Sequence, residues 1–198
     1  KFRSSSDTET ILGAYEEYGL DFPSKLRGMF AVGIWDPKSK ELILARDRFG
    51  IKRLYYSVVG NDFFFASEAK ALLPFLPKIS TDEDALSEYL VLQNLLGDKT
   101  LFGGIRQVMP GEIVRVAGNN IIKTKYWDVS YDIDYGMTEA SAETQLQQVF
   151  EESMNLHLRS DVDVGSYLSG GVDSSLVTRF GSKDLGYPMQ AFHGRLSL

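Results

Sequence analysis

The residues best suited to chemistry in this sequence are the glycines and hydroxyls of residues 169–175, which read Ser-Gly-Gly-Val-Asp-Ser-Ser. They follow a stretch at 162–168 that is typical of a buried strand, and apolar residues at helical spacing continue after them. Glycines let a backbone approach an anion closely, and the free N–H groups at a helix start attract negative charge. The segment therefore predicts a phosphate-binding loop, with three serine hydroxyls as further donors: Ser169, Ser174 and Ser175.

An ordinary strand-to-helix turn would use some of the same residues. The two glycines would then supply positive φ, and Asp173 or Ser174 would cap the helix. The full pattern behind an apolar strand favours phosphate binding over this alternative. The loop lacks the Gly-Lys-Ser/Thr ending of a Walker loop, so no lysine within it is placed to reach a terminal phosphate.

Residues 169–175 resemble the PP-loop of ATP pyrophosphatases, which grips the β- and γ-phosphates with Mg²⁺ and leaves the α-phosphate open to attack by a carboxylate. Residues 157–165 read His-Leu-Arg-Ser-Asp-Val-Asp-Val-Gly and resemble the entry to the synthetase domain of glutamine-hydrolysing asparagine synthetases. The resemblance implies ATP and Mg²⁺ as cofactors, with Asp173 as the candidate Mg²⁺ ligand. It implies ATP contacts, largely through backbone atoms, at Tyr167, Leu168, Ser169, Gly170, Gly171, Asp173, Ser174, Ser175 and Gly194.

The first half of the chain resembles the glutaminase domain of the same family. The similarity lies in residues 26–31, 46–56, 65–72 and 97–102, and the resemblance as a whole spans most of residues 6 to 195. Arg53 departs from the pattern, because the family usually has proline there. We expect that departure to loosen a turn without touching the chemistry.

Asp7 is the second site candidate. A carboxylate in the first turn of a helix complements the helix dipole by about 0.3–1 kcal/mol, which would suffice to explain it. Residues 6–9, however, read Ser-Asp-Thr-Glu and match in order and position the family motif whose aspartate binds the α-amino group of glutamine. The resemblance thus implies that Asp7 is a glutamine-binding residue.

Composition excludes several classes of function. The net charge of −6 and the lack of a basic stripe argue against nucleic-acid binding. The absence of cysteine rules out disulfides and thiolate metal sites and fits a cytoplasmic protein, while the lack of a long apolar span argues against membrane insertion. With two histidines, a zinc site or a histidine-based triad is not expected, and we interpret His193 as a half-buried strand histidine.

Periodicity predicts a helix over 7–18 with a Ser6/Glu9 capping box, strands at 29–35 and 41–46, and hairpins over 54–66 and 111–127. A helix after Asp82 carries an apolar stripe of Leu86, Tyr89 and Leu90, which we expect to pack in a core. A helix at 138–158 should present Leu146, Val149, Phe150 and Met154 on one face, ahead of a βαβ unit whose second strand is 189–193.

The predicted fold class is α+β followed by α/β. Residues 1–128 are expected to be the C-terminal part of a glutaminase domain, 129–137 a linker, and 138–198 the N-terminal part of a PP-loop synthetase domain. The resemblance implies a partial αββα sandwich of the Ntn-hydrolase type in the first part. In the second part it implies the start of a Rossmann-like PP-loop domain.

The resemblance implies a parent enzyme that makes asparagine from aspartate, glutamine and ATP through β-aspartyl-AMP, with glutamine hydrolysis supplying ammonia. The parent is expected to be a homodimer. No catalytic residue is expected in this chain, because the family's nucleophile is an N-terminal cysteine; we expect an internal fragment that is inactive alone. Two alternatives remain: an amidotransferase with another acceptor, β-lactam synthetase-like or acting on a cell-surface sugar, and a non-catalytic nucleotide-binding relative.

Overall fold

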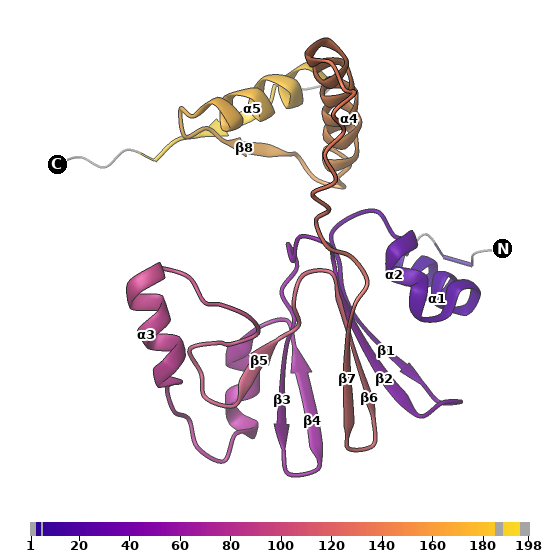
Figure 1. Ribbon diagram of the computed structural model, residues 1–198, viewed down its shortest axis with the longest axis vertical. Coiled ribbons are helices and arrows are strands. Elements are labelled where there is room, and N and C mark those ends of the chain that lie inside the picture. The colour runs from indigo at the N-terminus through magenta and orange to yellow at the C-terminus, as the bar shows by residue number, and fades with distance from the viewer. Residues whose placement is uncertain (1–2, 5, 185–187, 195–198) are drawn as a thin grey trace. The chain divides into compact units, whose positions relative to one another are not determined.

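The computed structural model describes residues 3–4, 6–184 and 188–194 and is shown in Figure 1. The chain divides into two compact units, Lys1–Ser130 and Tyr131–Leu198. Across the described residues, no helix is both long and apolar enough to span a membrane.

The first unit opens with helix α1 (Asp7–Tyr18). As predicted, the Ser6 side chain caps it by accepting a hydrogen bond from the Thr8 N–H at 3.2 Å, and the helix ends at Gly19. The reciprocal half of the predicted capping box is wrong. The Glu9 carboxylate instead accepts hydrogen bonds from the Ser4 hydroxyl and from the backbone N–H groups of Arg3 and Ser4, and these bonds lower the pKa of Glu9.

Two antiparallel sheets form the body of this unit. The first has the order β1-β2-β6-β7, built from β1 (Ala31–Asp36), β2 (Glu41–Arg46), β6 (Glu112–Ala117) and β7 (Asn120–Lys125). The second has the order β4-β3-β5, built from β3 (Tyr55–Val59), β4 (Asp62–Ala66) and β5 (Ile105–Gln107). The predicted hairpins β3–β4 and β6–β7 are both present.

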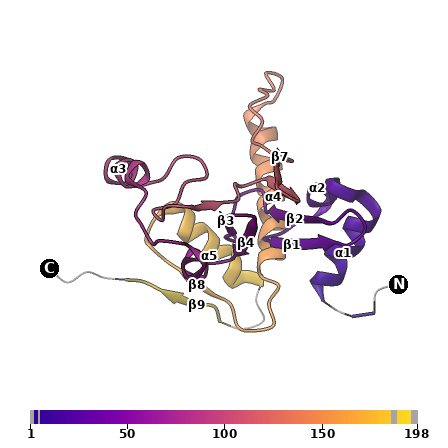
Figure 2. The ribbon, with the colours of Figure 1, turned by 90° about the horizontal axis from the view of Figure 1, so that it is seen from below.

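The four-stranded sheet is covered on both faces. Ile43 and Ala45 of β2 belong to one buried cluster, against which α1 packs through Ile11, Ala14 and Tyr15. Leu44, between them in sequence, belongs to a second cluster with Tyr56 of the other sheet and with Leu54, which directly precedes that strand. Because alternate residues of a strand point to opposite faces, β2 is apolar along nearly its whole length. Figure 2 shows α1 outside β1 and β2, with β3 and β4 on the far side.

Helical turns cover the outer face of the three-stranded sheet. Phe64 of β4 stacks on Phe75 of the 3₁₀ helix η2 (Ala69–Phe75), with ring centroids 4.4 Å apart. Two further short helical segments, η1 (Gly19–Asp21) and α2 (Phe22–Lys25), follow α1. The unit is thus layered helix, sheet, sheet, helix.

Helix α3 (Glu83–Leu92) corrects one prediction. It is capped by Asp82, as expected, through a 3.0 Å hydrogen bond from the Ala85 N–H. Its apolar stripe is not in a core, because Leu86, Tyr89 and Leu90 are 38%, 40% and 67% exposed. Ala85 is the buried residue of this helix, so α3 rests on its small side chain and leaves the larger ones open.

Arg46 and Asp47, at the end of β2, organise the following loop from inside. The buried Asp47 carboxylate accepts hydrogen bonds from the backbone N–H groups of Phe49, Ile51 and Lys52, at 3.0 to 3.1 Å. The Arg46 guanidinium donates to the carbonyls of Lys52, Gly50 and Val108, at 2.6 to 2.8 Å. These two side chains fix the course of residues 47–53.

We predict that Asp47→Ala lowers the free energy of unfolding of the first unit by about 2–4 kcal/mol, because three N–H groups lose their acceptor together. Urea unfolding monitored by the intrinsic fluorescence measures the loss. Asp62→Asn, at an exposed position of the β3–β4 hairpin, is the matched control and should change stability by less than about 0.5 kcal/mol. Equal effects of the two variants would contradict the assigned role of Asp47.

Tyr126 generates a prediction about alkaline pH. Its hydroxyl donates to the Arg46 carbonyl at 2.7 Å, and burial raises the pKa of Tyr126 to about 12 from 10.0. Between those values the folded chain keeps a proton that the unfolded chain loses, so the free energy of unfolding falls as the pH rises. Tyr126→Phe should reduce that fall, and should cost about 1 kcal/mol at neutral pH for the lost hydrogen bond. Unfolding curves at pH 7 and across pH 10–12 test this, with the exposed Tyr131→Phe as the variant that should keep the original slope.

The second unit contains α4 (Glu139–His157), β8 (Gly165–Tyr167), α5 (Val172–Asp184) and β9 (Gln190–Phe192). Strands β8 and β9 pair in parallel, which confirms the predicted βαβ arrangement. Phe150 of α4 packs edge-on against Phe180 of α5 at 4.9 Å, and Met154 is buried. Leu146 and Val149 are not part of that core, since they are 70% and 61% exposed.

The predicted buried strand at 162–168 is shorter and more open than expected. Only residues 165–167 are in β8, and Tyr167 is 86% exposed. With two strands, this sheet has no layer on one of its faces among the described residues, whereas a parallel sheet normally buries both.

Candidate functional site

The loop between β8 and α5 turns at Gly170, which has φ 86 and no atom within 4 Å of where a Cβ would stand. This left-handed backbone favours glycine, and the open space beside it is room for a ligand to approach the main chain. Gly171 follows with an ordinary φ, and its N–H lies 3.4 Å from the Ser169 hydroxyl oxygen. The turn therefore exposes main chain at the carboxyl end of β8.

Helix α5 starts directly after this turn, and its first hydrogen bond runs from the Ser175 N–H to the Gly171 carbonyl at 3.1 Å. Among the described residues, no hydrogen bond engages the N–H groups of Val172, Asp173 or Ser174. Such free donors at the positive end of a helix suit an anion.

The serine hydroxyls lie at the loop, but two of them are turned inward. Ser174 and Ser175 both donate to the Gly171 carbonyl, at 3.1 and 2.8 Å, and the hydroxyls of Ser169 and Ser174 are 3.0 Å apart. The sequence-based expectation that all three serines donate to a phosphate therefore requires at least Ser174 and Ser175 to change partner.

The ends of β8 and β9 meet, as expected for a parallel pair. The Leu168 N–H donates to the Phe192 carbonyl at 2.9 Å, and Nδ1 of His193 lies 2.9 Å from the Leu168 carbonyl. His193 is exposed and lies beyond β9, so its interpretation as a half-buried strand residue is wrong. Gly194 follows it with nothing within 4 Å of a Cβ position. Tyr167 and Gly194 thus flank the open edge that the loop occupies.

The loop's donor set fits a nucleotide phosphate. Asp173, in the first turn of α5, is the carboxylate nearest in sequence to the free N–H groups. The described part of the chain contains no cluster of three or more His, Cys, Asp or Glu residues able to hold a metal alone. Mg²⁺ in nucleotide sites usually takes one or two carboxylates and completes its shell with phosphates and water, so one aspartate is compatible with Mg·ATP.

Asp7 lies in a separate pocket of about 410 Å³ in the first unit. The apolar part of its lining comes from α1, from β1 and from the segment that enters β1, and includes Ile11, Phe30 and Val32. In the described structure no ion pair joins Asp7 to another residue, and Asp7 stands at the start of α1, exposed to the pocket. A carboxylate in such a pocket can receive the ammonium group of a small ligand.

Three residues of this pocket were not expected from the sequence: Lys52, Arg53 and Ser67. Lys52 and Arg53 follow the loop that Asp47 holds, and they bring two cations to the pocket that contains Asp7. Arg53, which departs from the family pattern, therefore lines the pocket that contains Asp7. The available signal in the sequence was a pair of consecutive cations separated from Gly50 by one residue, but only the folded loop brings them to the pocket of Asp7.

Two family models match this sequence, one after the other along the chain. Residues 1–127 match the family model described as glutamine amidotransferase domain, and the chain belongs to this family. Residues 145–196 match the model described as asparagine synthase, so an amidotransferase domain is followed here by the start of an asparagine synthase domain.

Curated relatives carry different names at similar identity. The chain is 39% identical over 178 residues to asparagine synthetase [glutamine-hydrolyzing] 1 of Bacillus subtilis (strain 168), covering 89% of this chain and 28% of that protein. It is 36% identical over 187 residues to amidase chyE of Penicillium rubens, covering 89% of this chain and 26% of that protein. The chain therefore spans about a quarter of the length of the curated relatives it matches.

Among solved structures, the chain resembles glutamine phosphoribosylpyrophosphate amidotransferase from B. subtilis complexed with ADP and GMP. The TM-score is 0.44 at 17% identity, over 98% of this chain and 40% of that one. A likeness at this level carries no argument about function.

Because the two glycines of the loop differ in backbone conformation, we predict different effects of replacing them by alanine. Gly170→Ala places a Cβ on a left-handed backbone and should destabilise the second unit by about 1–2 kcal/mol. Gly171→Ala is the matched control, because its φ is not positive and its Cβ would meet only the Ser169 hydroxyl at 3.6 Å. Hydrogen exchange of the α5 amides measures both. Equal protection in the two variants would contradict the geometry of the loop.

Proposed function

We propose that a protein containing this chain transfers the amide nitrogen of glutamine to a carboxylate that ATP activates, and that the acceptor is aspartate and the product asparagine. The observation that carries the proposal is the succession, in one chain, of an amidotransferase domain and the start of an asparagine synthase domain. One domain supplies nitrogen, and the other supplies the activated acceptor. Under this proposal the boundaries are residues 1–128, a linker at 129–137, and 138–198.

In the first domain, Asp7 binds the α-ammonium group of glutamine. The lining of the pocket around it includes one carboxylate, several apolar residues and the two cations Lys52 and Arg53, and the carboxylate is the group in it that can take an ammonium ion. A charge-assisted hydrogen bond to the carboxylate contributes about 1.5–3 kcal/mol, more than the dipole effect of an aspartate at a helix start. The nucleophile that attacks the glutamine amide comes from outside this chain, which has no cysteine.

In the second domain, residues 169–175 hold the phosphates of ATP. The free N–H groups at the start of α5 orient the phosphate oxygens, and Gly170 leaves the main chain accessible to them. In this proposal Asp173 holds Mg²⁺, and Tyr167 and Gly194 border the space for the nucleoside. Bound Mg·ATP supplies the adenylyl group that activates the acceptor carboxylate, with pyrophosphate as the leaving group.

A second acceptor class is supported by the relatives. Amidase chyE has nearly the same identity and coverage as the asparagine synthetase of B. subtilis. The residues described here belong to the glutamine side and to the phosphate loop, and neither selects the acceptor. An acceptor other than aspartate would therefore use the same Asp7 and the same loop.

Two variants of the complete protein test the proposal by separating the half-reactions. Asp7→Asn should lower kcat/KM for glutamine by about ten- to a hundredfold, the equivalent of one charge-assisted hydrogen bond, while synthesis from ammonia persists. Asp173→Ala should abolish ATP-dependent synthesis and leave glutamine hydrolysis largely intact. Glutamate, pyrophosphate and asparagine are quantified in each reaction.

The controls fix what each outcome means. Asp62→Asn, which is exposed and lies neither in the lining of the Asp7 pocket nor in the phosphate loop, should keep both activities. Parallel loss of both half-reactions in a folded Asp173→Ala protein would contradict the division of roles. Pyrophosphate release with an acceptor other than aspartate, and none with aspartate, would retain the amidotransferase class and replace asparagine as the product.

A further inference from the structure

A second pocket of the first unit, of about 500 Å³, lies beside α3 and is not used by the proposed function. We name it the α3 pocket. Its polar lining comes from Arg53, Tyr55, Tyr89, Gln93, Asn94, Lys99, Thr100 and Gln107. Of the residues that line it, only Arg53 also lines the pocket of Asp7.

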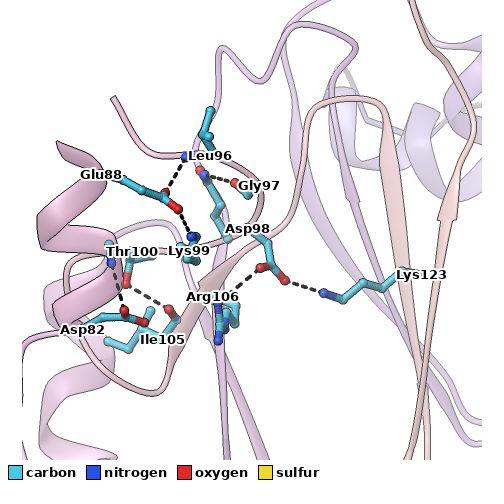
Figure 3. A network of polar contacts seen from close by, with 12 residues as sticks. Asp82, Glu88, Leu96, Gly97, Asp98, Lys99, Thr100, Ile105, Arg106 and Lys123 are labelled. Atoms are coloured by element: carbon cyan, nitrogen blue, oxygen red, sulfur yellow. Dashed lines mark hydrogen bonds and ion pairs between the residues drawn. The ribbon is translucent and has the colours of Figure 1, made fainter. Parts of the chain in front are cut away.

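The wall of the α3 pocket is held in place by polar contacts (Figure 3). The Glu88 carboxylate pairs with Lys99 and accepts a hydrogen bond from the Leu96 N–H at 3.2 Å. The Asp98 carboxylate binds Lys123 at 2.6 Å and Arg106 at 3.4 Å. The segment after α3, residues 94–99, is thereby tied to the helix at one end and to both sheets at the other.

The turn that leads into this wall has a backbone conformation that is unfavourable for a non-glycine residue. Gln93, directly after α3, has φ 54, which a non-glycine residue rarely adopts. Its N–H still bonds to the Tyr89 carbonyl at 2.8 Å, so the helix ends here and the chain turns into the pocket wall. The result is that the side chains of Gln93 and Asn94, two neutral amides, both border the pocket.

The α3 pocket carries one net positive charge, that of Arg53, which no nearby carboxylate neutralises among its lining residues. No carboxylate lines it, and the positive charge of Lys99 is matched by Glu88. In the part of the chain that the structure describes, no hydrogen bond or ion pair engages the Arg53 guanidinium. Burial, and to a lesser extent the charge of Arg53, lower the pKa of Arg46, which places these two cations near one another. An anion is the missing partner.

We propose that the α3 pocket binds a small monocarboxylate that carries a neutral hydrogen-bonding tail. The planar fork of Arg53 pairs with the carboxylate, and the amides of Gln93 and Asn94 and the Tyr89 hydroxyl meet the tail. One uncompensated cation matches one negative charge better than a phosphate dianion. The absence of a carboxylate from the lining disfavours an α-ammonium group, which distinguishes this ligand from the glutamine of the Asp7 pocket.

Binding of succinamate to the full 198-residue chain tests the proposal, because this compound has one carboxylate, one carboxamide and no ammonium group. Titration followed by NMR should give a Kd of about 1–10 mM, typical of a ligand with so few atoms. Succinamide, which lacks the charge, and inorganic phosphate should each bind at least about tenfold more weakly. Arg53→Gln should weaken succinamate binding by about tenfold or more.

Variants of each pocket locate the site. Asn94→Ala, which alters only the α3 pocket, should weaken binding, whereas Asp7→Asn, which alters only the other pocket, should not. Lys38→Gln removes the same charge as Arg53→Gln from an exposed turn and should leave the Kd unchanged. Equal binding of succinamide, tighter binding of phosphate, a larger effect of Asp7→Asn than of Asn94→Ala, or no binding at 50 mM succinamate would each overturn the proposal.

Discussion

The first unit depends on one buried carboxylate, which supplies the hydrogen bonds that a loop without sheet or helix partners would otherwise lack. Asp47 accepts hydrogen bonds from three N–H groups of the loop that follows a strand, and Arg46 donates to carbonyls of the same loop and of the segment before β6. A loop so close to the core has no sheet partner, and unpaired backbone groups there would cost about 1–3 kcal/mol each. Because this pair fixes residues 47–53, it also decides where Lys52 and Arg53 stand, and both the Asp7 pocket and the α3 pocket take part of their lining from this loop.

Most elements of the fold could be predicted because their signals are local. The Ser6 cap, the hairpin turns and the parallel βαβ pair are set by residues within a few positions of one another. Burial was harder to predict. An apolar stripe on α3 has the same sequence pattern whether or not another element covers it, and the exposure of Leu90 reflects the position of neighbouring segments rather than the helix itself.

The candidate sites divide in the same way. The position of the loop at the end of β8 follows from its glycines, which are contiguous in sequence, and Asp7 follows from a four-residue motif. The residues that line the pocket together with Asp7 could not be predicted, since Arg53 and Ser67 come from segments far from Asp7 in the sequence. The orientation of the serine hydroxyls could not be predicted from the sequence either. The hydroxyls of Ser174 and Ser175 can donate either to the Gly171 carbonyl in the preceding turn or to a ligand. The free-energy difference between these two orientations is not encoded by the residue type.

The inward serines have a thermodynamic consequence for the loop. The Gly171 carbonyl already accepts two hydroxyls, so an incoming anion exchanges one acceptor for another instead of satisfying an idle donor. The enthalpy gained from each serine is then the difference between its hydrogen bond to a charged oxygen and its hydrogen bond to the neutral carbonyl. The Gly171 carbonyl that is released must be hydrogen-bonded by water instead. Selectivity at these two positions therefore grows with the charge density of the ligand's oxygens, which makes the serines discriminate among oxyanions more than they increase affinity for all of them.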